Sequence, residues 1–460
     1  MNGQPGPALR LYRSTAPLVA GVAETLASFS PKLAAGIRGR RGLLERSVAA
    51  ADRLRGCVWV HVTSVGEYEQ ARPVIAAIRD RLGAAAPPVA VTHFSPSGWE
   101  FARRRPCADW HDYLPLDRPA DMRRLVRAWQ PRLLLFVKFD CWPNLVLEAH
   151  AAGVPLFLLA ATLQPPGARL HPLARPLFRD VFGRFQHVGA VSEEDRRRFV
   201  DDLDVRCPVS VTGDTRAEQV IRRYEESEAG SVAARLLEPG GRVLVLGSTW
   251  PPDEQLWLPV LPELLGRYRD LRVVLAPHEP LPHRLAALEA DLDRRGIAHR
   301  RLSALMDGAA TGATAATAAA DAAGAAATAS GPAASARCVL VDSVGVLAEI
   351  YRAGTLAYVG GSFTTGVHNT MEPAVASLPV MFGPRIQNAE EAARLVRREA
   401  GFVLRTPADA RGTADALLSD PDRLTRCGEA ARAVVLEQRG ATARSLAVLE
   451  PALVPESSPC

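Results

Sequence analysis

The sequence predicts an α/β protein made of two similar halves, each built on a parallel sheet that helices cover on both faces. From Val58 onward, short β-branched runs alternate with helical patterns, which is the rhythm of βαβ units. The chain has 460 residues, three times the ~150 residues of a typical domain, so it has room for two. A polar stretch from Tyr224 to Gly241 interrupts this rhythm and ends in Pro-Gly-Gly, which favours a domain boundary there.

Strands are expected where short aliphatic runs precede a turn. In the first half these runs are Val58–Val62, Val89–Thr92, Leu133–Val137, Leu156–Leu159, Val188–Val191 and Val209–Thr212; in the second half they are Val243–Leu246, Val273–Ala276, Val339–Val341, Thr355–Val359 and Val380–Phe382. Helices over 422–449 are expected to brace the halves together. The predicted organisation is an N-terminal helical segment (1–41), a first domain (42–225), a second domain (240–430), and a C-terminal helix and tail (431–460).

The N-terminal segment contains an apolar stripe. Its longest uncharged run, Ser14 to Ala23, is shorter than the ~20 residues that a membrane-spanning helix needs. A break at Ser30-Pro31 is expected to end one helix and begin another. The arginines Arg38, Arg40 and Arg41 follow, so this face either lies in a membrane interface beside anionic headgroups or packs on its own domain. The residues that share the helical face are Leu18, Val22, Leu26, Phe29, Leu33 and Ile37.

Composition excludes several classes of protein. Hydrophobic residues make up 48% and charged residues 23%, which fits a globular core rather than a disordered or multi-spanning chain. The net charge of +5 is spread over scattered arginines, so no nucleic-acid partner is predicted. Seven scattered cysteines without CxxC spacing are expected to be reduced thiols. The Ala-, Thr-, Gly- and Ser-rich tract 304–337 has few large side chains to bury and is expected to be a surface insertion without an assigned function.

Candidate chemistry in the first half lies in the turns that follow strands, because ligands of open α/β sheets bind beyond the carboxyl ends of the strands. Glu67 closes the turn Thr63-Ser64-Val65-Gly66-Glu67 and is a candidate general base. The same residues also form a capping-box pattern, in which Ser64 caps a helix and Glu67 bonds back to its amide. Both interpretations stay open at this point.

Two further turns of the first half carry charged residues. Lys138 and Asp140 follow the predicted strand 133–137, and Asp140 either caps the next helix or shares the crevice of Glu67. The turn Gly213-Asp214-Thr215-Arg216 follows the last strand. Its Arg216 is either a fixed cation for an anionic leaving group or an ordinary surface arginine.

The second half carries the strongest local signal. Gly360-Gly361 ends a strand and leads through His368 to Asn369 and Glu372. Exposed backbone amides there suit a phosphate and the carboxylate suits ribose hydroxyls, although Asn369 and Glu372 also fit a capping box. Equivalent turns after the other strands would complete one nucleotide pocket: Ser248-Thr249, Pro277-His278 and Asp342-Ser343-Val344-Gly345.

Other chemistries lack their motifs. The sequence has no GxxxxGK[ST] loop, no HExxH, no GxSxG elbow and no cysteine–histidine cluster at zinc spacing. The DxD-like patterns at 202–204 and 291–293 fall in helical contexts. No metal and no cofactor are therefore predicted.

The order of several motifs resembles the 3-deoxy-D-manno-octulosonic acid (Kdo) transferases of lipopolysaccharide synthesis, glycosyltransferase family 30. The family's SVGE turn is seen as Ser64-Val65-Gly66-Glu67, and its WPN segment as Trp142-Pro143-Asn144. Its HNxxEP stretch is seen at 368–373, with Phe382-Gly383-Pro384 beyond. Together with the N-terminal apolar segment, the similarity covers nearly the whole chain.

The resemblance implies a GT-B glycosyltransferase, in which two Rossmann-like domains face each other across a cleft. It would transfer Kdo with inversion from CMP-Kdo to a lipid A precursor (lipid IVA) at the cytoplasmic face of the inner membrane, as a peripheral or monotopic protein. Glu67 would be the base, and Asp140 and Arg216 would support the transition state. The segments that match the CMP site, together with Ser248 and Thr249, are Pro277, His278, Val344, Gly345, Val346, Asn369, Thr370, Met371 and Glu372.

The sequence departs from the family's common form in three places. Lys138 and Asp140 stand where glutamates are common, Gly213-Asp214-Thr215-Arg216 replaces GNLK, and Ser377 stands where glycine is common. Two alternatives remain: a GT-B enzyme with another acidic sugar or acceptor, and a non-catalytic sugar-nucleotide or lipid-binding protein of the same fold.

Overall fold

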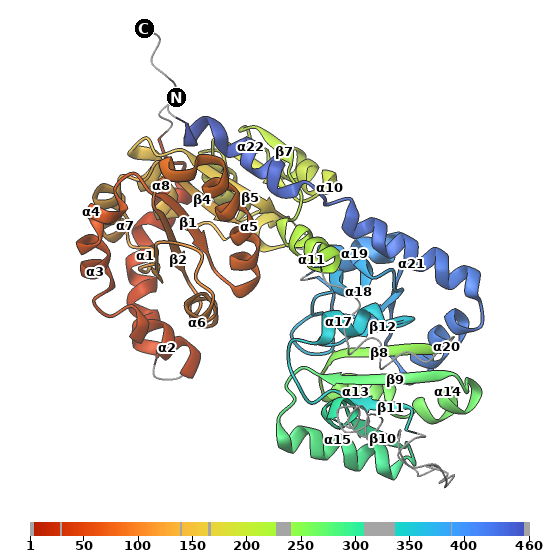
Figure 1. Cartoon of the computed structure of the whole chain (residues 1–460). Helices are drawn as coiled ribbons and strands as arrows, with labels where there is room; N and C mark the ends of the chain where they lie inside the picture. The colour runs from red at the N-terminus through yellow and green to blue at the C-terminus, as the bar shows by residue number, and fades with distance from the viewer. Residues whose placement is uncertain are drawn as a thin grey trace, which may run out of the picture. The chain divides into compact units, whose positions relative to one another are not determined.

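The computed structural model describes residues 4–27, 30–138, 140–163, 167–226, 241–307, 336–387 and 389–454 (Figure 1). The chain divides into two compact units: unit 1 is Met1–Gln219 with Gly440–Cys460, and unit 2 is Val220–Arg439. Most of the Ala-rich tract and most of the polar stretch before Gly241 lie outside the described residues. The C-terminal helices are shared between the units, because α21 (Pro421–Leu436) falls in unit 2 and α22 (Ala441–Leu453) in unit 1.

Unit 1 is built on a seven-stranded parallel sheet with the order β3-β2-β1-β4-β5-β6-β7. Its central strands are buried along their whole length, which explains their nearly continuous aliphatic sequences. The strands are β1 (Val58–Val62), β2 (Val89–His93), β3 (Trp110–Tyr113), β4 (Leu133–Val137), β5 (Leu156–Ala161), β6 (His187–Ala190) and β7 (Val209–Val211).

Helices cover both faces of this sheet. On one face Trp59 packs edge-on against Trp129 of α7, within a cluster that includes residues of α8 and α9. On the other face Val58, Val60 and Val62 pack against α5 and against Leu449 of α22. The helices are α1 (Pro7–Leu26), α2 (Pro31–Gly39), α3 (Leu43–Ala49), α4 (Ala51–Leu54), α5 (Val65–Leu82), α6 (Pro96–Arg104), α7 (Pro119–Trp129), α8 (Pro143–Ala151), α9 (Arg175–Phe182) and α10 (Glu193–Arg197), with short turns η2 (Gly83–Ala85), η3 (Ala168–Leu170) and η4 (Arg198–Asp202).

Unit 2 has a second seven-stranded parallel sheet, ordered β10-β11-β9-β8-β12-β13-β14. Two buried clusters, one containing Trp257 and the other Tyr351, cover its two faces. The strands are β8 (Arg242–Thr249), β9 (Leu271–Pro277), β10 (His299–Arg301), β11 (Cys338–Leu340), β12 (Leu356–Val359), β13 (Val380–Phe382) and β14 (Gly401–Val403). The helix α11 (Thr215–Glu226) crosses the division, because its residues up to Gln219 belong to unit 1 and the rest to unit 2. The helices of unit 2 that follow it and precede α21 are α13 (Pro251–Trp257), α14 (Leu261–Arg267), α15 (Pro282–Arg294), α17 (Leu347–Arg352), α18 (Met371–Val375), α19 (Glu390–Arg397) and α20 (Pro407–Leu418).

The predicted α/β class with parallel sheets is confirmed, and the eleven expected runs all form strands. Three strands were not predicted: β3, β10 and β14. All three lie at an edge of their sheet.

The N-terminal helices differ in part from the expectation. Ser30 caps α2 through the Leu33 amide, as the Ser-Pro break predicts. Arg40 does not lie free for a lipid headgroup, because its guanidinium donates to the carbonyl oxygens of Phe94 and Leu114 at 2.9 and 2.8 Å. It also lies 4.6 Å above the Phe94 ring. Arg40 is therefore a structural residue that ties α2 to β2 and β3.

Strand order reverses at one point in each sheet. In unit 1 the chain passes from the β1–β2 side to β4 next to β1, and in unit 2 it passes from the β8–β9 side to β12 next to β8. Such a switch point opens a crevice beyond the carboxyl ends of the two strands, where ligands of open α/β sheets bind. The turns after β1, β4, β8 and β12 are therefore where a site is expected.

Candidate active site

Glu67 lies at the switch point of unit 1, in the first turn of α5. Ser64 caps this helix and accepts from the Glu67 amide at 3.3 Å. The Glu67 carboxylate accepts from the Thr63 amide, one residue before the position that the capping box predicts. Its residue surface is only 4% exposed, and this burial raises the carboxyl pKa; the Thr63 amide opposes the rise and the Asp140 charge adds to it. Glu67 thus combines a capping contact with the raised pKa of a candidate base.

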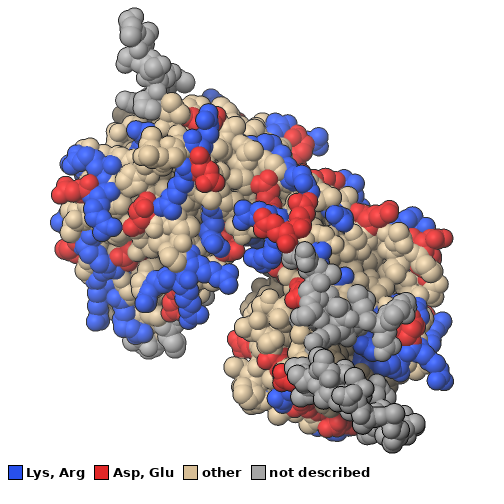
Figure 2. Space-filling view, in the orientation of Figure 1, with Lys and Arg blue, Asp and Glu red and all other residues tan. Residues whose placement is uncertain are grey.

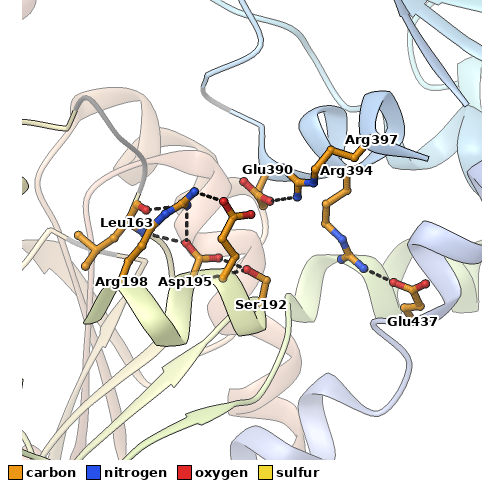
Figure 3. A network of polar contacts seen from close by, with 9 residues as sticks. Leu163, Ser192, Asp195, Arg198, Glu390, Arg394, Arg397 and Glu437 are labelled. Atoms are coloured by element: carbon orange, nitrogen blue, oxygen red, sulfur yellow. Dashed lines mark hydrogen bonds and ion pairs between the residues drawn. The ribbon is translucent and has the colours of Figure 1, made fainter. Parts of the chain in front are cut away.

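A second Ser-x-x-acid pair in unit 1 shows what a purely structural carboxylate looks like here. Ser192 accepts from the Asp195 amide at 3.1 Å, and Asp195 accepts from the Leu163 amide at 2.9 Å (Figure 3). Arg198 lies 3.8 Å from the Asp195 carboxylate. The ion pairs of the described residues include this one but none to Glu67. Glu67 therefore lacks the arginine that neutralises its structural counterpart.

Figure 3 also labels two ion pairs of unit 2. Arg394 pairs with Glu437, and Arg397 donates to Glu390 at 2.7 Å. These contacts join α19 to itself and to the residue that follows α21. They are structural contacts of unit 2.

Asp140 approaches the same crevice from the end of β4. Its carboxylate accepts from Arg169 at 2.6 Å, and its charge raises the Glu67 pKa while that of Lys138 lowers it. Asp140 does not cap α8, because Asp117 performs that role through the amides of Asn144 and Leu145 at 2.9 and 3.0 Å. Of the two interpretations of Asp140, the shared crevice is therefore the one that the contacts favour.

Arg216 lies in the first turn of α11 and is held by Asp214. Its Nε and Nη2 donate to Asp214 Oδ2 at 3.1 and 2.7 Å, and its amide donates to Oδ1 at 2.9 Å. Asp214 is buried, which alone would raise its pKa, but the charge and hydrogen bonds of Arg216 and Gln70 lower it. Gln70 Nε2 donates to Asp214 at 3.1 Å. Gln70 lies one helical turn after Glu67, so this ion pair is fixed to the helix that carries the candidate base.

In unit 2 the end of β8 turns sharply at the switch point. Ser248 has a φ of +54° at a bulge in the strand, and the Gly360 amide donates to the Gly247 carbonyl at 2.9 Å. Thr249 is buried and donates to Glu254 at 3.3 Å. Arg284 of α15 donates to the Glu254 carboxylate at 2.7 and 2.8 Å. The turn after β8 is thereby joined to α13 and α15.

The glycine turn after β12 is held by Asp253, which is fully buried. Its carboxylate accepts from the Tyr358 hydroxyl at 2.5 Å and from the Gly361 amide at 3.0 Å. A Cβ on Gly360 would lie 2.3 Å from the Ser248 carbonyl oxygen, so the two turns approach too closely for any side chain there. Because no side chain fits at Gly360, only the backbone of Gly360-Gly361 borders the switch point there.

The segment 369–372 is built differently from the predicted capping box. Asn369 accepts from the Met371 amide at 3.0 Å, and Thr370 rather than Asn369 occupies the N-cap position of α18. This helix has only five residues, so its dipole is weak support for a phosphate site. Burial raises the Glu372 pKa, while Arg223, 3.6 Å away, and Asn369 oppose the rise. Among the described residues the fully buried Thr370 hydroxyl has no hydrogen-bond partner.

The remaining predicted residues of unit 2 surround the same strand ends. Pro277 ends β9 and is buried, whereas His278 is exposed. Val344 is 78% exposed, and Gly345 has a φ of +89° in the turn after β11. In each unit the predicted residues therefore lie together at the carboxyl ends of the strands.

Several residues of these networks were not among the predicted site residues: Gln70, Arg169 and Asp253. Only Asp253 had a usable signal, since an acidic residue in the first turn after Pro-Pro favours a helix start. The others are recognised only by three-dimensional contacts. No group of three or more metal-ligating side chains was found in the described ranges.

Two parallel seven-stranded α/β sheets are the architecture of the GT-B fold. The UDP-GlcNAc 2-epimerase from Neisseria meningitidis bound to UDP-GlcNAc has this fold: the TM-score is 0.57 at 11% identity, over 86% of this chain and 99% of that one.

Residues 35–219 match the 3-deoxy-D-manno-octulosonic-acid transferase (kdotransferase) family. The 3-deoxy-D-manno-octulosonic acid transferase of Bordetella pertussis is 29% identical over 85% of this chain and 86% of its own length. That of Chlamydophila psittaci is 28% identical over 75% of this chain and 74% of its own. The chain belongs to the Kdo transferase family and is a glycosyltransferase.

Proposed function

We propose that this enzyme transfers Kdo from CMP-Kdo to a lipid A precursor, with Glu67 as the general base. The observation that carries the proposal is the Glu67 carboxylate. It is buried at a switch point, has a raised pKa and has no cation within ion-pair distance among the residues described, whereas Asp195 in the same local motif is paired. A helix cap needs neither a raised pKa nor the absence of an ion pair, whereas both features suit a general base.

The reaction follows from these groups. A hydroxyl oxygen of the acceptor attacks the anomeric carbon of Kdo, the bond from that carbon to the phosphate oxygen breaks, and the hydroxyl proton passes to Glu67. CMP leaves with the bonding electron pair. Arg216 supplies a fixed positive charge for the growing negative charge of the phosphate, and Asp140 with Arg169 orients the acceptor side of the crevice.

The donor half of the proposal concerns unit 2. The turns after β8, β9, β11 and β12 present backbone amides, the Thr370 hydroxyl and the Glu372 carboxylate at one sheet edge. A cytidine nucleotide needs amide donors for its phosphate and a carboxylate for ribose hydroxyls. The residues assigned to this role are Ser248, Thr249, Pro277, His278, Val344, Gly345, Val346, Asn369, Thr370, Met371 and Glu372.

The test is incubation of the purified chain with CMP-Kdo and a tetra-acylated lipid A precursor in detergent, followed by mass spectrometry. The expected products are the precursor carrying added Kdo and one released CMP for each Kdo transferred. A panel of CMP- and UDP-sugars tests the alternative donors. CMP binding without CMP release from CMP-Kdo, with every acceptor supplied, would contradict the proposal and indicate a binding protein.

We further propose that unit 1 binds the membrane surface through α1 and α2, which would place the enzyme at the inner membrane as a peripheral protein. No helix among the described residues is long and apolar enough to cross a bilayer. One face of α1, with Leu9, Ala16 and Ala20, is buried on unit 1. The opposite face exposes large apolar side chains at one-turn and two-turn spacings: Leu11, Leu18, Val19, Val22 and Leu26.

Charge near this apolar face supports an anionic bilayer as its occupant. Figure 2 shows Lys and Arg side chains gathered over the part of unit 1 that holds α2, α3 and α6. Exposed arginines of this region are Arg38, Arg41, Arg103 and Arg104. Apolar side chains beside arginines are the composition of an interfacial helix.

The variant Leu18→Glu/Val22→Glu should reduce flotation with vesicles that contain phosphatidylglycerol by at least about tenfold, because two side chains lose apolar burial in the bilayer and gain charge. The matched control is Leu281→Glu/Val396→Glu, which changes two exposed apolar residues of unit 2. The control should float like the original chain. Equal flotation of both variants would contradict membrane binding through α1.

A further inference from the structure

Three aromatic rings meet at the carboxyl ends of β8, β9 and β12 in unit 2. Trp250 follows β8, His278 follows β9, and His368 lies in the loop after β12. Trp250 Nε1 donates to His368 Nε2 at 2.9 Å, with the two ring planes 19° apart. The His278 ring stacks on both partners, at 4.9 Å from Trp250 and 4.2 Å from His368 between centroids. An indole and an imidazole therefore form a hydrogen-bonded pair on which a second imidazole lies.

The indole bond determines the tautomer of His368. An indole N–H only donates, so His368 Nε2 accepts, and a neutral ring then carries its proton on Nδ1. Burial lowers the pKa of His368 to about 4, and neighbouring His278 acts in the same direction. At neutral pH the His368 ring can therefore donate one hydrogen bond, from Nδ1. Its acceptor nitrogen, Nε2, is already bonded to Trp250.

Buried contacts hold both members of this pair in place. Asp253 accepts from the Trp250 amide at 2.8 Å and from the Gly361 amide at 3.0 Å, which joins the two turns that carry the rings. Gly361 has a φ of +96°, and a Cβ there would lie 2.7 Å from His368 Cδ2. The His368 amide donates to the Gly360 carbonyl at 3.1 Å. The ring pair is therefore preorganised before any ligand binds.

We propose that Trp250 is a positioning residue of the nucleotide site. Its indole N–H fixes His368 in the Nδ1–H tautomer, and the Trp250–His368 pair forms the platform on which His278 is held against the nucleotide. This role rests on the proposed binding of a cytidine nucleotide by unit 2. A phosphate or a cytosine carbonyl oxygen is an acceptor, so a neutral donor of fixed direction suits it without a charge that depends on pH.

The substitution Trp250→Phe tests this role, because phenylalanine keeps an aromatic ring beside His278 but is smaller and has no N–H donor. In the full-length protein labelled with ¹⁵N-histidine, NMR should show His368 as the Nδ1–H tautomer in the original chain. In the variant it should show a mixture of tautomers and a His368 pKa higher by about one unit, since the lost bond stabilised only the neutral ring. His368→Gln identifies the resonance by its disappearance.

A second readout separates positioning from folding. CMP affinity measured by calorimetry should fall by about five- to tenfold in Trp250→Phe, and KM for the donor should rise with kcat within about twofold. Trp142→Phe is the matched control, because Trp142 Nε1 donates to His61 Nε2 at 2.8 Å in unit 1. That variant should change the His61 resonances and leave those of His368 unchanged.

Each outcome has a defined meaning. An unchanged tautomer and pKa of His368 in Trp250→Phe would overturn the assignment, as would a changed tautomer with unchanged CMP affinity. Failure of the original chain to bind CMP would instead reject the proposed function of unit 2, while the NMR result would still report whether Trp250 sets the tautomer.

Discussion

Replacing Glu67 with glutamine should lower kcat by about 10²- to 10⁴-fold, the usual contribution of a positioned general base. Glutamine is nearly isosteric and its side-chain oxygen still accepts from the Thr63 amide, so the capping contact is retained. KM for the sugar nucleotide should stay within about twofold. The measurement is steady-state CMP release in the presence of the lipid acceptor.

A matched control separates the two roles of Glu67. Asp409 belongs to another capping box, in which Thr406 accepts from the Asp409 amide at 3.2 Å and Asp409 accepts from the Thr406 amide at 3.0 Å. It begins α20 of unit 2, far along the chain from every candidate residue. Asp409→Asn should keep the rate of the original enzyme. Equal rates for Glu67→Gln and Asp409→Asn would show that Glu67 is only a helix cap.

The pH profile of the original enzyme gives independent evidence. A general base must be deprotonated, so kcat/KM should fall as pH falls through the Glu67 pKa. Burial raises that pKa above the usual range of glutamate, and the Asp140 charge adds to the rise although the Thr63 amide and Lys138 oppose it. The acidic limb is therefore expected above the model-peptide value of about 4.3, and it should be absent from the residual activity of Glu67→Gln.

The sheets were predictable because burial on both faces requires nearly continuous aliphatic sequence in the central strands. The strands β3, β10 and β14 were missed for the converse reason. They lie at sheet edges, are short, and read WHDY, HRR and GFV, so they carry little of the apolar signal. An edge strand needs only one partner and partial burial, and its pairing is decided by the neighbouring strand rather than by its own side chains.

The sequence predicted where the candidate site residues lie along the chain, but it did not predict which side chains they contact. Turns after strands are found from strand ends alone, which explains why Glu67, Arg216 and the Gly360-Gly361 turn were found. Two of the partners come from remote segments: Arg169 holds Asp140, and Asp117 caps α8 in place of Asp140. Asp214 lies only two residues before Arg216, but the sequence of the turn does not show that the two residues pair. No local pattern distinguishes these carboxylates and arginines from the many others in an arginine-rich chain.

The structure of unit 1 explains why two residues of the turn 213–216 depart together from the family's common sequence. Asp214 stands where the family commonly has a neutral asparagine, and it neutralises the very arginine that replaces the common lysine. The pair is largely buried, since the Asp214 side chain is 9% and the Arg216 side chain 27% exposed. Asp214 and Arg216 therefore act as one unit, and a change to either residue alone is expected to affect folding as well as catalysis.

Arg216→Met should destabilise unit 1 by about 3 kcal/mol at pH 7.5, because it leaves the buried Asp214 carboxylate without its cation. It should also lower kcat by about 10²-fold if, as proposed, Arg216 supplies the charge that stabilises the leaving phosphate. The double variant Asp214→Asn/Arg216→Met removes the unpaired charge as well, so its unfolding midpoint in calorimetry should recover most of the loss. Its kcat should stay low.

The pH dependence distinguishes an unpaired charge from a simple loss of packing. In the original chain the folded-state pKa of Asp214 is lowered, so the pair stabilises the fold above the unfolded pKa of about 3.9 and loses this effect as pH falls through the folded value. In Arg216→Met the charge and the side-chain hydrogen bonds of Arg216 no longer oppose the effect of burial, so the Asp214 pKa rises. The variant then gains stability relative to the original chain as pH falls from 8 to 5, and the difference between their melting temperatures narrows.

Both measurements have a contradicting result. A melting difference that is constant between pH 8 and pH 5 would mean that Asp214 carries no unpaired charge in Arg216→Met. Recovery of kcat together with stability in the double variant would mean that Arg216 serves only to neutralise Asp214. A stable double variant with low kcat would assign both roles to Arg216. Its stability would show that Arg216 neutralises Asp214 in the original chain, and its low kcat would show that Arg216 also acts on the reacting groups.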